Sequence, residues 1–569
     1  MKCSTKASRS MSAIRLIFCS SVLMCMTQLA HAAFTDNITI GNAKALSLGH
    51  AVTADPPDID SIHYNPAGLV QLKDRRRFIK GIAGLFATEM ELGEYGEYQT
   101  NLLNIASDPY RDEQGNLSAE GQAYLYDEAL NSKSEAEGPT VMLPGGMVDL
   151  PAAIGLLGGA SYNPPGSKVT FATSVYSPMM NGFHRADDDP GRFAQQRVAF
   201  TVITYFSPSV AIEMTDEFSV GFSVNFNYAG MGMQLPAREP HVAILFLGSP
   251  FIQDNLCPDG DPAVASLDLC NDLPPYTEYA EIRFEVDNPL VLGYNFGMLW
   301  EPLPWMTFGL SYNSALDVTM KGEFEFPINE PFKTFLYDLQ NSKFWNNLVG
   351  AASGFGVQLP TAEDVKNDPS GPMEVSYTLP QRINAGISLQ ITPDLKYNLD
   401  YRWTEWSAFS NIDLNFGIDV PILMWGALAD EVGTGGINGI SPNSVAYKLG
   451  LQDVGYWGMG AEYRYNDRLV LRAGFEKRPS AVPKEAPNAF IPINDGNLIS
   501  LGFGYDFDAD SHIDFGMGYF SSETYHPPCT AQLGNSCDPN NVVFNPYAGQ
   551  EITTRVEFLI FEFNYQERF

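Results

Sequence analysis

Apolar side chains alternate with small or polar ones along many short stretches of the chain. The alternation is clearest in five stretches, namely Phe218–Tyr228, Ile383–Ile391, Leu395–Trp403, Leu469–Phe475 and Ile513–Tyr519. Each stretch places large apolar or aromatic residues on one face and Gly, Ser, Asn or charged residues on the other. A period of two is that of a β-strand with one apolar face. The pattern predicts an all-β protein whose strands begin near Phe78.

Short turns and long polar segments separate the predicted strands. Thr392–Asp394 and Asn466–Arg468 are short turns, whereas long polar segments lie near residues 93–140, 235–280, 327–378, 420–452 and 521–548. Strands of about 9–11 residues with short turns at one end and long loops at the other are typical of transmembrane β-barrels. A soluble sandwich also alternates, but it needs neither aromatic residues at so many strand ends nor an export signal.

The last residues of the chain give the strongest single strand pattern. One face carries Leu559, Phe561, Phe563, Tyr565 and the terminal Phe569. A terminal Phe that ends an alternating aromatic strand resembles the tag by which outer-membrane barrels are recognised for assembly. Glu567 is a small departure, because an aromatic or apolar residue is usual there. We therefore expect the barrel-assembly machinery and outer-membrane lipids as partners.

Residues 1–32 have the three parts of a secretory signal peptide. Lys2, Lys6, Arg9 and Arg15 form a basic region, residues 16–29 are mostly apolar, and residues 30–32 (Ala-His-Ala) fit a cleavage site. The apolar part is too short to span a membrane as a helix, which takes about 20 residues. The mature chain is predicted to start at Ala33-Phe34. No later stretch is apolar for about 18 residues, which leaves a closed barrel as the way to span a membrane.

Composition and charge narrow the function classes. The chain has 36 Phe, 27 Tyr and 50 Gly, which suits a barrel with aromatic and small faces. Removal of the signal peptide leaves 30 basic against 67 acidic residues, a formal net charge of −37. Such acidity argues against nucleic acid or an anionic membrane surface as a partner. Solvated loop charge is the favoured explanation, with divalent cations bound at an acidic outer face as the alternative.

The cysteines predict two disulfides. Three of the seven leave with the signal peptide, and the others form two local pairs in polar loops, Cys257 with Cys270 and Cys529 with Cys537. In an exported protein such pairs are expected to close loops as disulfides. Their spacing does not match a zinc site, which places two ligands two to four residues apart and repeats the pair. We expect no metal and no cofactor.

A turn near the start of the mature chain gives the first specific resemblance. By itself Asn65-Pro66-Ala67-Gly68 is typical of any surface turn, since Asn-Pro extends the backbone and Gly lets it bend. Here it follows an export signal and a polar segment and precedes a series of strands. That order resembles the FadL family of outer-membrane channels for long-chain fatty acids and other hydrophobic compounds. In that family a short N-terminal hatch plugs the barrel, and the Asn-Pro-Ala turn lies where the hatch meets the wall.

Three further regions extend the resemblance over most of the mature chain. They contain Leu292–Pro302 with Gly309–Ser314 and Met320–Phe324, then Leu379–Arg382 with Asp400–Phe409, then Tyr463–Asp467 with Leu471–Phe475 and Val482-Pro483. The departure is length, since this chain looks longer than is usual for the family, with the excess in the loops.

The resemblance implies a monomeric barrel of about fourteen strands. Residues 33–76 would form the hatch and residues 77–569 the barrel. A hydrophobic ligand would bind first between the extracellular loops and then in an internal pocket. Movement of the hatch N-terminus, at Ala33-Phe34, would open a path to a gap in the wall. We place that gap at Ser177-Pro178, because proline interrupts a strand ladder. A lateral exit suits a fatty acid, which gains about 0.8 kcal/mol per methylene kept out of water.

Candidate ligand contacts follow from the loops and the lumen face. Two apolar runs interrupt the polar loops and could form the groove, and they include Val242, Ile244, Leu245 and Phe246 in one and Phe335, Phe344, Trp345 and Leu348 in the other. Exposed apolar patches tend to mark binding, although these runs could also pack loop against loop. Arg382, Arg402 and Arg472 fall on the lumen face and could bind a carboxylate. Pairing with an acidic neighbour is the favoured role for each of them alone.

Four functions are compatible with this pattern, and we favour the first. They are passive uptake of long-chain fatty acids, uptake of aromatic or aliphatic hydrocarbons, a structural or adhesive barrel, and a barrel enzyme such as a lipase. No histidine of the mature chain lies in a recognisable nucleophile motif, so we expect no enzyme and no catalytic residue. His63, beside the Asn-Pro turn, is predicted to contact the hatch.

Overall fold

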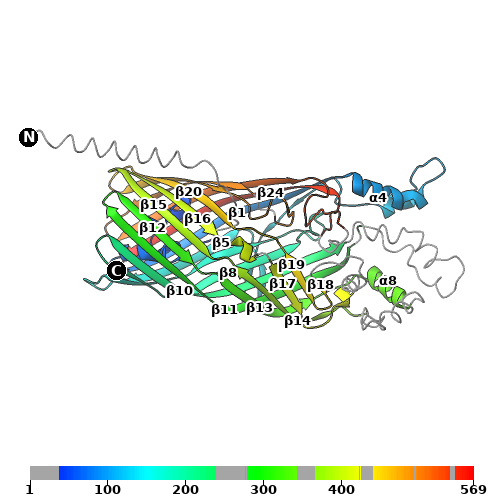
Figure 1. Ribbon diagram of the computed structural model, residues 1–569, viewed down its shortest axis with the longest axis horizontal. Helices are drawn as coiled ribbons and strands as arrows, with labels where there is room; N and C mark the ends of the chain where they lie inside the picture. The colour runs from blue at the N-terminus through cyan, green and yellow to red at the C-terminus, as the bar shows by residue number, and fades with distance from the viewer. Residues whose placement is uncertain are drawn as a thin grey trace, which may run out of the picture.

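The computed structural model is an antiparallel barrel closed by fourteen strand positions (Figure 1). The structure describes residues 37–238, 276, 278–341, 366–409, 411–421, 423–424, 440–491, 495–538 and 545–569. The first and last strands close the ring, with Arg76 opposite Arg568 at one end and Tyr95 opposite Gln550 at the other. In the part of the chain just defined, no helix has both the length and the apolarity to cross a membrane. The predicted all-β barrel is confirmed.

Eight strand positions are continuous and six are made of two segments. The continuous strands are β1 (Arg75–Tyr95), β5 (Ala153–Tyr162), β10 (Phe218–Arg238), β11 (Glu278–Leu303), β21 (Leu469–Arg478), β22 (Gly496–Asp506), β23 (Ser511–His526) and β24 (Gln550–Arg568). The two-segment positions are β6 (Val169–Ser174) with β7 (Tyr176–His184), β8 (Arg197–Phe206) with β9 (Ser209–Glu213), β12 (Met306–Asn313) with β13 (Leu316–Glu325), β14 (Ser370–Leu379) with β15 (Arg382–Thr392), β16 (Leu395–Thr404) with β17 (Asn411–Phe416), and β19 (Ser444–Lys448) with β20 (Val454–Arg464).

The two faces of the strands follow the alternation in the sequence. In β10, Ser223, Asn225 and Asn227 point into the barrel and are buried, whereas Phe222 points outward and is exposed. In β11 the outward side chains of Leu290 and Leu292 expose 52% and 59% of their surface. Large apolar side chains exposed in such a row are stable only against lipid. These rows therefore mark the membrane-facing band.

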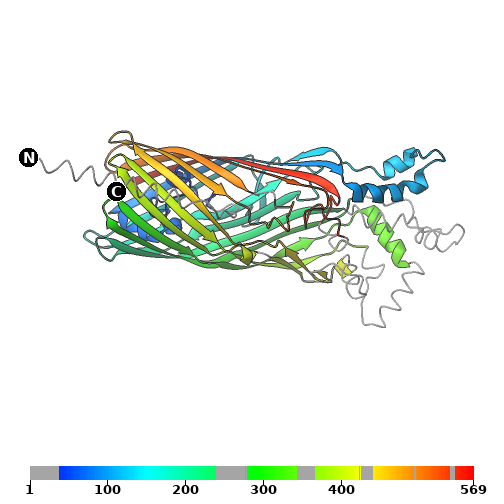
Figure 2. The same ribbon diagram turned by 45° about the horizontal axis from the view of Figure 1, so that its top comes forward.

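The two ends of the barrel differ. Short turns and the C-terminus lie at one end, and long connections with helices lie at the other (Figure 2). The connections between the fourteen strand positions contain α4 (Glu97–Ser107), η2 (Asp108–Tyr110), α5 (Ala119–Tyr124), β2 (Ser132–Glu135), β3 (Gly138–Leu143), β4 (Gly146–Asp149), α8 (Glu330–Asn341), η3 (Trp406–Phe409) and β18 (Ile440–Ser441). Of these, β2 pairs with β1, and β3 pairs with β7. This asymmetry makes the helical end the extracellular one.

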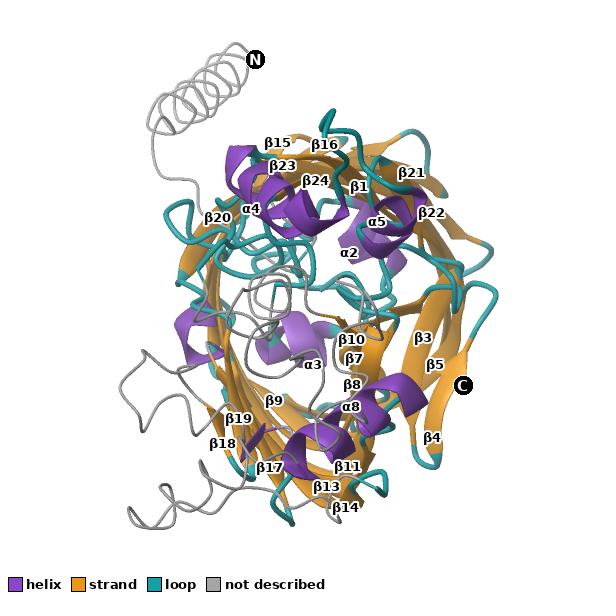
Figure 3. Cartoon of the chain, turned by 90° about the vertical axis from the view of Figure 1, so that its right-hand side faces the viewer, coloured by secondary structure: helices purple, strands orange, loops and turns teal. Residues whose placement is uncertain are grey.

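The hatch lies inside the barrel. It consists of α2 (Ala43–Ser47), α3 (Ser61–Tyr64) and η1 (Pro66–Gln71), joined by irregular segments. Seen from the extracellular end, α2 and α3 lie within the ring of strands (Figure 3). These elements are short because their sequence is rich in Gly, Pro and Asp, which interrupt helices. Their backbone groups must therefore find partners on the barrel wall.

Candidate functional site

The Asn65-Pro66-Ala67 turn joins the hatch to the wall. The Asn65 side-chain amide donates to the carbonyl of Thr53 at 2.8 Å and to that of Met298, in β11, at 3.0 Å. Its oxygen accepts the backbone N–H of Ala67 at 3.2 Å, which caps η1. Asn65 is fully buried, so each of these bonds satisfies a group that water cannot reach. The turn is thus a fixed joint between the hatch and β11.

Other side chains of the wall bind the hatch backbone in the same way. The side-chain amides of Asn295 and Asn313 donate to the carbonyls of Ile62 at 2.8 Å and His63 at 3.0 Å. The Asp400 carboxylate accepts both the backbone N–H and the hydroxyl of Thr53, at 2.8 and 2.7 Å. These contacts supply the partners that the irregular hatch cannot supply itself.

Buried ion pairs fix the hatch further. The Lys80 ammonium of β1 lies 2.5 Å from the Asp60 carboxylate, and both side chains are almost fully buried. Elsewhere on the wall, the Glu476 carboxylate of β21 binds the Arg402 guanidinium of β16 at 2.7 Å and the His50 ring of the hatch at 2.9 Å. Such pairs depend on both partners, because a single buried charge is costly.

Glycines let the hatch approach the wall closely. A Cβ on Gly221 would lie 2.2 Å from the Pro66 carbonyl carbon, and one on Gly309 would lie 2.1 Å from the Thr53 oxygen. We call the lumen-facing glycines whose Cβ would lie closer than 3.0 Å to a hatch atom the glycine belt, which consists of Gly159, Gly221, Gly297, Gly309, Gly458, Gly460, Gly474, Gly502, Gly516 and Gly518. At most of these positions the hatch atom belongs to the backbone, so a side chain would force the hatch away from the wall.

A pocket lies between the hatch and the wall. Its lining mixes polar amides with apolar and aromatic side chains, and consists of His63, Tyr176, Pro178, Met179, Thr204, Asn225, Asn227, Gly293, Tyr294, Asn295, Asn313, Ser314, Leu316, Leu379, Pro380 and Arg382. Several of these residues lie where one strand segment ends and the next begins, as Pro380 does between β14 and β15. The pocket thus forms at a level where strand pairing is interrupted.

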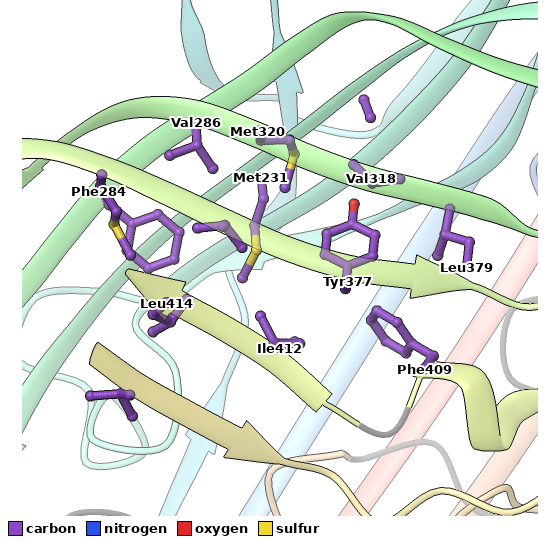
Figure 4. Packing of buried hydrophobic residues seen from close by; sticks show 14 of the residues in the cluster. Met231, Phe284, Val286, Val318, Met320, Tyr377, Leu379, Phe409, Ile412 and Leu414 are labelled. Atoms are coloured by element: carbon purple, nitrogen blue, oxygen red, sulfur yellow. The ribbon is translucent and has the colours of Figure 1, made fainter. Parts of the chain in front are cut away.

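An apolar column rises from the pocket toward the extracellular end. Met179 and Leu379 belong both to the pocket and to a large buried cluster. Much of the cluster comes from β10, β11, β13, β14, β17 and η3. Its labelled members in Figure 4 are Met231, Phe284, Val286, Val318, Met320, Tyr377, Leu379, Phe409, Ile412 and Leu414. The lumen above the pocket is therefore lined by hydrocarbon and aromatic rings.

The hydrogen-bonded wall is interrupted beside the pocket. β5 pairs with β6 only over Gly159–Tyr162, and the last bond of this ladder runs from the Val175 N–H to the Gly158 carbonyl at 2.9 Å. Beyond it, no backbone pairing joins residues 153–157 to β7 in the described chain. The register of β7 also shifts between Tyr176 and Met179, around Pro178. We call this interval the wall break.

The wall break is closed above by the β3–β4 hairpin. Gly138 and Pro139 of β3 pair with His184 and Phe183 of β7, which restores the ladder. The hairpin then crosses the outside of the barrel, where the Met147 N–H donates to the outward Glu285 carboxylate of β11 at 3.0 Å. The interruption is therefore bounded at both ends.

The first described residues of the hatch lie behind the wall break. The Thr39 hydroxyl donates to the carbonyl of Ser177 at 2.9 Å. On the other side, Ile38 packs with Ile82 of β1, and Gly41 lies against Leu157 of β5. The segment Asn37–Gly41, which we call the hatch arm, therefore runs across the inner side of the break.

The extracellular mouth is covered on one side by loops. The Arg238 guanidinium, at the end of β10, binds Asp127 at 2.6 Å and the carbonyl of Pro546 at 2.8 Å. It also lies 4.6 Å from the ring centre of Phe193 and 4.8 Å from that of Tyr547. The first and last loops are thus joined around one buried cation. A disulfide between Cys529 and Cys537 closes the last loop, as predicted.

The predicted ligand contacts separate in the structure. Arg382 lines the pocket. Arg402 is bound to Glu476, and Arg472 is bound to Glu462 and Asp514, at 2.8 and 2.5 Å. Outside the described residues lie Ala33, Phe34, Val242, Ile244, Leu245, Phe246, Cys257, Cys270, Phe344, Trp345 and Leu348. Phe335 belongs to α8, but its side chain is not among those described.

Sequence reasoning missed the polar lining of the pocket. The alternation in Phe218–Tyr228 puts Asn225 and Asn227 on the polar face, but it does not indicate that they line a pocket. A usable signal was the set of prolines that interrupt predicted strands, since Pro178 and Pro380 both line it.

These features define a class of protein: a transmembrane barrel of the outer membrane, plugged by its own N-terminal hatch, with an apolar lumen that leads to a lateral break. Residues 22–527 match the family described as outer membrane protein transport protein (OMPP1/FadL/TodX), and the chain belongs to that family.

Individual relatives are distant. The chain is 22% identical over 336 residues to a long-chain fatty acid transport protein of Escherichia coli O6:H1, which covers 55% of this chain and 64% of the relative. The corresponding match in Shigella flexneri is 22% identical over 318 residues and covers 56% and 59%. The matched region thus spans less than two thirds of either relative.

Solved structures share the fold. A FadL homologue of Pseudomonas aeruginosa superposes with a TM-score of 0.60 at 15% identity, over 95% of this chain and 100% of the other. The toluene transporter TodX of Pseudomonas putida superposes with a TM-score of 0.53 at 12% identity, over 94% and 99%.

Proposed function

We propose that the protein carries long-chain fatty acids, or related hydrophobic molecules, passively from the extracellular side and releases them sideways into the outer membrane. One observation supports this above the others: the pocket, the wall break and the hatch arm meet at the same segment of β7. Tyr176, Pro178 and Met179 line the pocket, and Ser177 between them binds the hatch arm.

The apolar route has a physical basis. A fatty-acid chain loses about 0.8 kcal/mol for every methylene group that is returned to water, so a wet central pore is a poor path. The column above the pocket offers buried apolar surface, and the outward faces of Ile154 and Leu156 at the wall break are 71% and 77% exposed. A molecule that passes from the column to the break would stay in apolar surroundings throughout.

The polar end of the pocket favours a ligand with a carboxylate. Arg382 supplies a permanent positive charge, and the lining amides of Asn225, Asn227, Asn295 and Asn313 can donate hydrogen bonds. We assign Arg382 as the carboxylate contact, while Arg402 and Arg472 serve the hatch and the wall. The two apolar loop runs predicted from the sequence stay our candidates for the first contact outside.

The hatch arm is the proposed gate. It lies behind the wall break and is held there by the bond between Thr39 and Ser177. We expect it to move when the ligand leaves, while the rest of the hatch stays fixed by Asn65 and the buried ion pairs. The sequence relatives are named long-chain fatty acid transport proteins, which supports fatty acid as the ligand.

A reversible lock tests the proposal. Cells that lack the protein are complemented with the wild type or with Thr39→Cys combined with Ser177→Cys, and uptake of labelled palmitate is measured before and after oxidation. We expect the wild type to restore uptake under both conditions, and the double variant to lose it on oxidation and regain it on reduction. Uptake that persists with the crosslink formed would refute the gate, and no uptake by the wild type would refute fatty acid as the ligand.

Hydrocarbon uptake and surface adhesion are the competing functions. Labelled hexadecane and toluene, taken up by the same strains, test the first. Unimpaired uptake of every lipid by the deletion strain would favour the second. We further propose that the barrel is a monomer and that β24, which ends at the terminal Phe569, is recognised by the assembly machinery.

A further inference from the structure

His63 belongs at once to the hatch and to the pocket. It lines the pocket together with Arg382, and its carbonyl accepts the Asn313 side-chain amide at 3.0 Å. Its ring packs edge-on against Tyr64 at 5.2 Å and Tyr176 at 5.3 Å between ring centres. The ring is therefore held in place between the fixed part of the hatch and the segment of β7 at the wall break.

The same ring holds the hatch arm. Its Nε2 lies 2.8 Å from the side-chain oxygen of Asn37, the first residue of the arm. Asn37 is buried and has a φ of 65°, a left-handed conformation that Asn adopts more readily than most residues. Two residues later, Thr39 binds Ser177. The arm is thus tied to the pocket at one point and to the wall at the next.

The protonation state of His63 limits its ring to one donated hydrogen bond, which goes to Asn37. Burial lowers the pKa of His63 well below its usual value, and the positive charges of Arg382 and Lys80, with His50, lower it further. The imidazole is therefore neutral and carries one N–H. Because the Asn37 oxygen can only accept, that N–H is on Nε2 and points to Asn37. The ring has no second N–H to offer to another acceptor.

We propose that His63 is a positioning residue that makes release of the hatch arm depend on the head group of the ligand. A carboxylate drawn to Arg382 takes the Nε2–H of His63 in place of the Asn37 oxygen. The arm then loses its bond to the pocket and leaves the wall break. Only a hydrogen bond is exchanged, and the proton stays on the ring. This inference rests on the proposed function and adds its regulation.

The mechanism separates ligands by chemistry rather than by size. A fatty acid and an alkane of the same length fill the apolar column equally well, but the alkane has no acceptor to replace Asn37. The wild type should therefore discriminate in favour of the acid by about the value of one buried hydrogen bond, which corresponds to about fivefold to tenfold in rate.

Four variants test this in uptake assays with labelled palmitate and hexadecane. His63→Leu and Asn37→Gly remove the two ends of the bond, and glycine keeps the left-handed backbone of residue 37. His63→Gln retains an N–H donor. Thr53→Val breaks a hatch bond to Asp400 outside the pocket and serves as the control for general loosening. Heat-modifiable gel mobility shows in each case that the barrel has folded.

We expect His63→Leu and Asn37→Gly to raise hexadecane uptake about fivefold to tenfold, toward the rate for palmitate, with no further increase in the double variant. His63→Gln and Thr53→Val should keep the preference of the wild type for palmitate. An unchanged preference in His63→Leu, a raised one in Thr53→Val, or equal uptake of both ligands by the wild type would overturn the inference. Equal uptake by the wild type would still leave lateral transport standing, whereas uptake of neither ligand would defeat the proposed function itself.

Hydrogen exchange tests the release of the hatch arm directly. Hydrogen exchange of the amides of residues 37–41 is followed in the purified wild type with palmitate, with hexadecane and without ligand. Exchange should accelerate with palmitate alone. Equal exchange in the three conditions would show that occupancy of the pocket does not release the arm.

Discussion

A single methyl group on Gly221 should separate the Asn65-Pro66-Ala67 turn from the wall. The Cβ of a Gly221→Ala variant would lie 2.2 Å from the carbonyl carbon of Pro66 and 2.5 Å from the nitrogen of Ala67. Ordinary contact begins near 3.4 Å, so the turn must retreat by about 1.2 Å. Both atoms belong to the backbone, and no flexible side chain can give way in their place.

The cost has two parts. Overpacking by one methyl group costs about 1–3 kcal/mol. A retreat of that size also stretches the 3.0 Å bond from Asn65 to the Met298 carbonyl beyond bonding distance, at about 1 kcal/mol. Together they destabilise docking of the hatch by about 2–4 kcal/mol, which raises the undocked population by about 30-fold to 700-fold, because each 1.4 kcal/mol is a factor of ten.

Hydrogen exchange of η1 measures this population. The matched control is Gly81→Ala in β1, where the added Cβ would meet nothing closer than the Gly155 oxygen at 3.9 Å. We expect faster exchange of η1 in Gly221→Ala alone, with both barrels folded by gel mobility. If exchange of η1 were unchanged in Gly221→Ala, the close contact of Pro66 with β10 would be wrong.

Three further changes have defined outcomes. Lys80→Met leaves the Asp60 carboxylate buried without its cation and should destabilise hatch docking by about 3–5 kcal/mol, measured as faster amide exchange in α2, with partial recovery when Asp60→Asn is added. Burial and the neighbouring Asp60 raise the pKa of Asp58 to about 7, so the hatch should lose stability as the pH rises from about 4 to about 7. Asp58→Asn should reduce that loss when hatch exchange, corrected for intrinsic rates, is measured across this range. Arg238→Met leaves Asp127 buried and unpaired, so the extracellular loops should be cut faster by protease while the barrel stays intact.

The strands could be predicted from the sequence better than the contacts between their side chains. Alternation placed Asn384, Asp400 and Asp514 on the lumen face, where all three are buried. It could not say that Arg402 meets Glu476, since this pair depends on the relative positions of three strands and not on the face of each. The face on which a side chain lies depends only on its place along its own strand. Ion pairing between strands depends also on their register and on how the barrel closes.

In the candidate site, too, the sequence indicates some residues but not the contacts between them. The Asn-Pro-Ala turn and Pro178 were visible as interruptions of a regular pattern, and Arg382 as a cation on the lumen face. The bond from His63 to Asn37 was not, because nothing in the spacing of 26 residues indicates that an irregular segment folds back on itself. An irregular segment has no hydrophobic periodicity, so its contacts cannot be predicted from the sequence pattern.

The glycine belt has an electrical consequence. A barrel of fourteen strands is too wide for its walls to meet, and on the belt it has no side chains with which to fill the space. With the hatch deleted, much of the lumen at that level would be filled by water. Such a barrel in a planar bilayer should conduct ions in large, steady steps, whereas the intact protein should be electrically silent. We therefore expect the hatch to block ion flow across the membrane, in addition to the gating role that we propose for it.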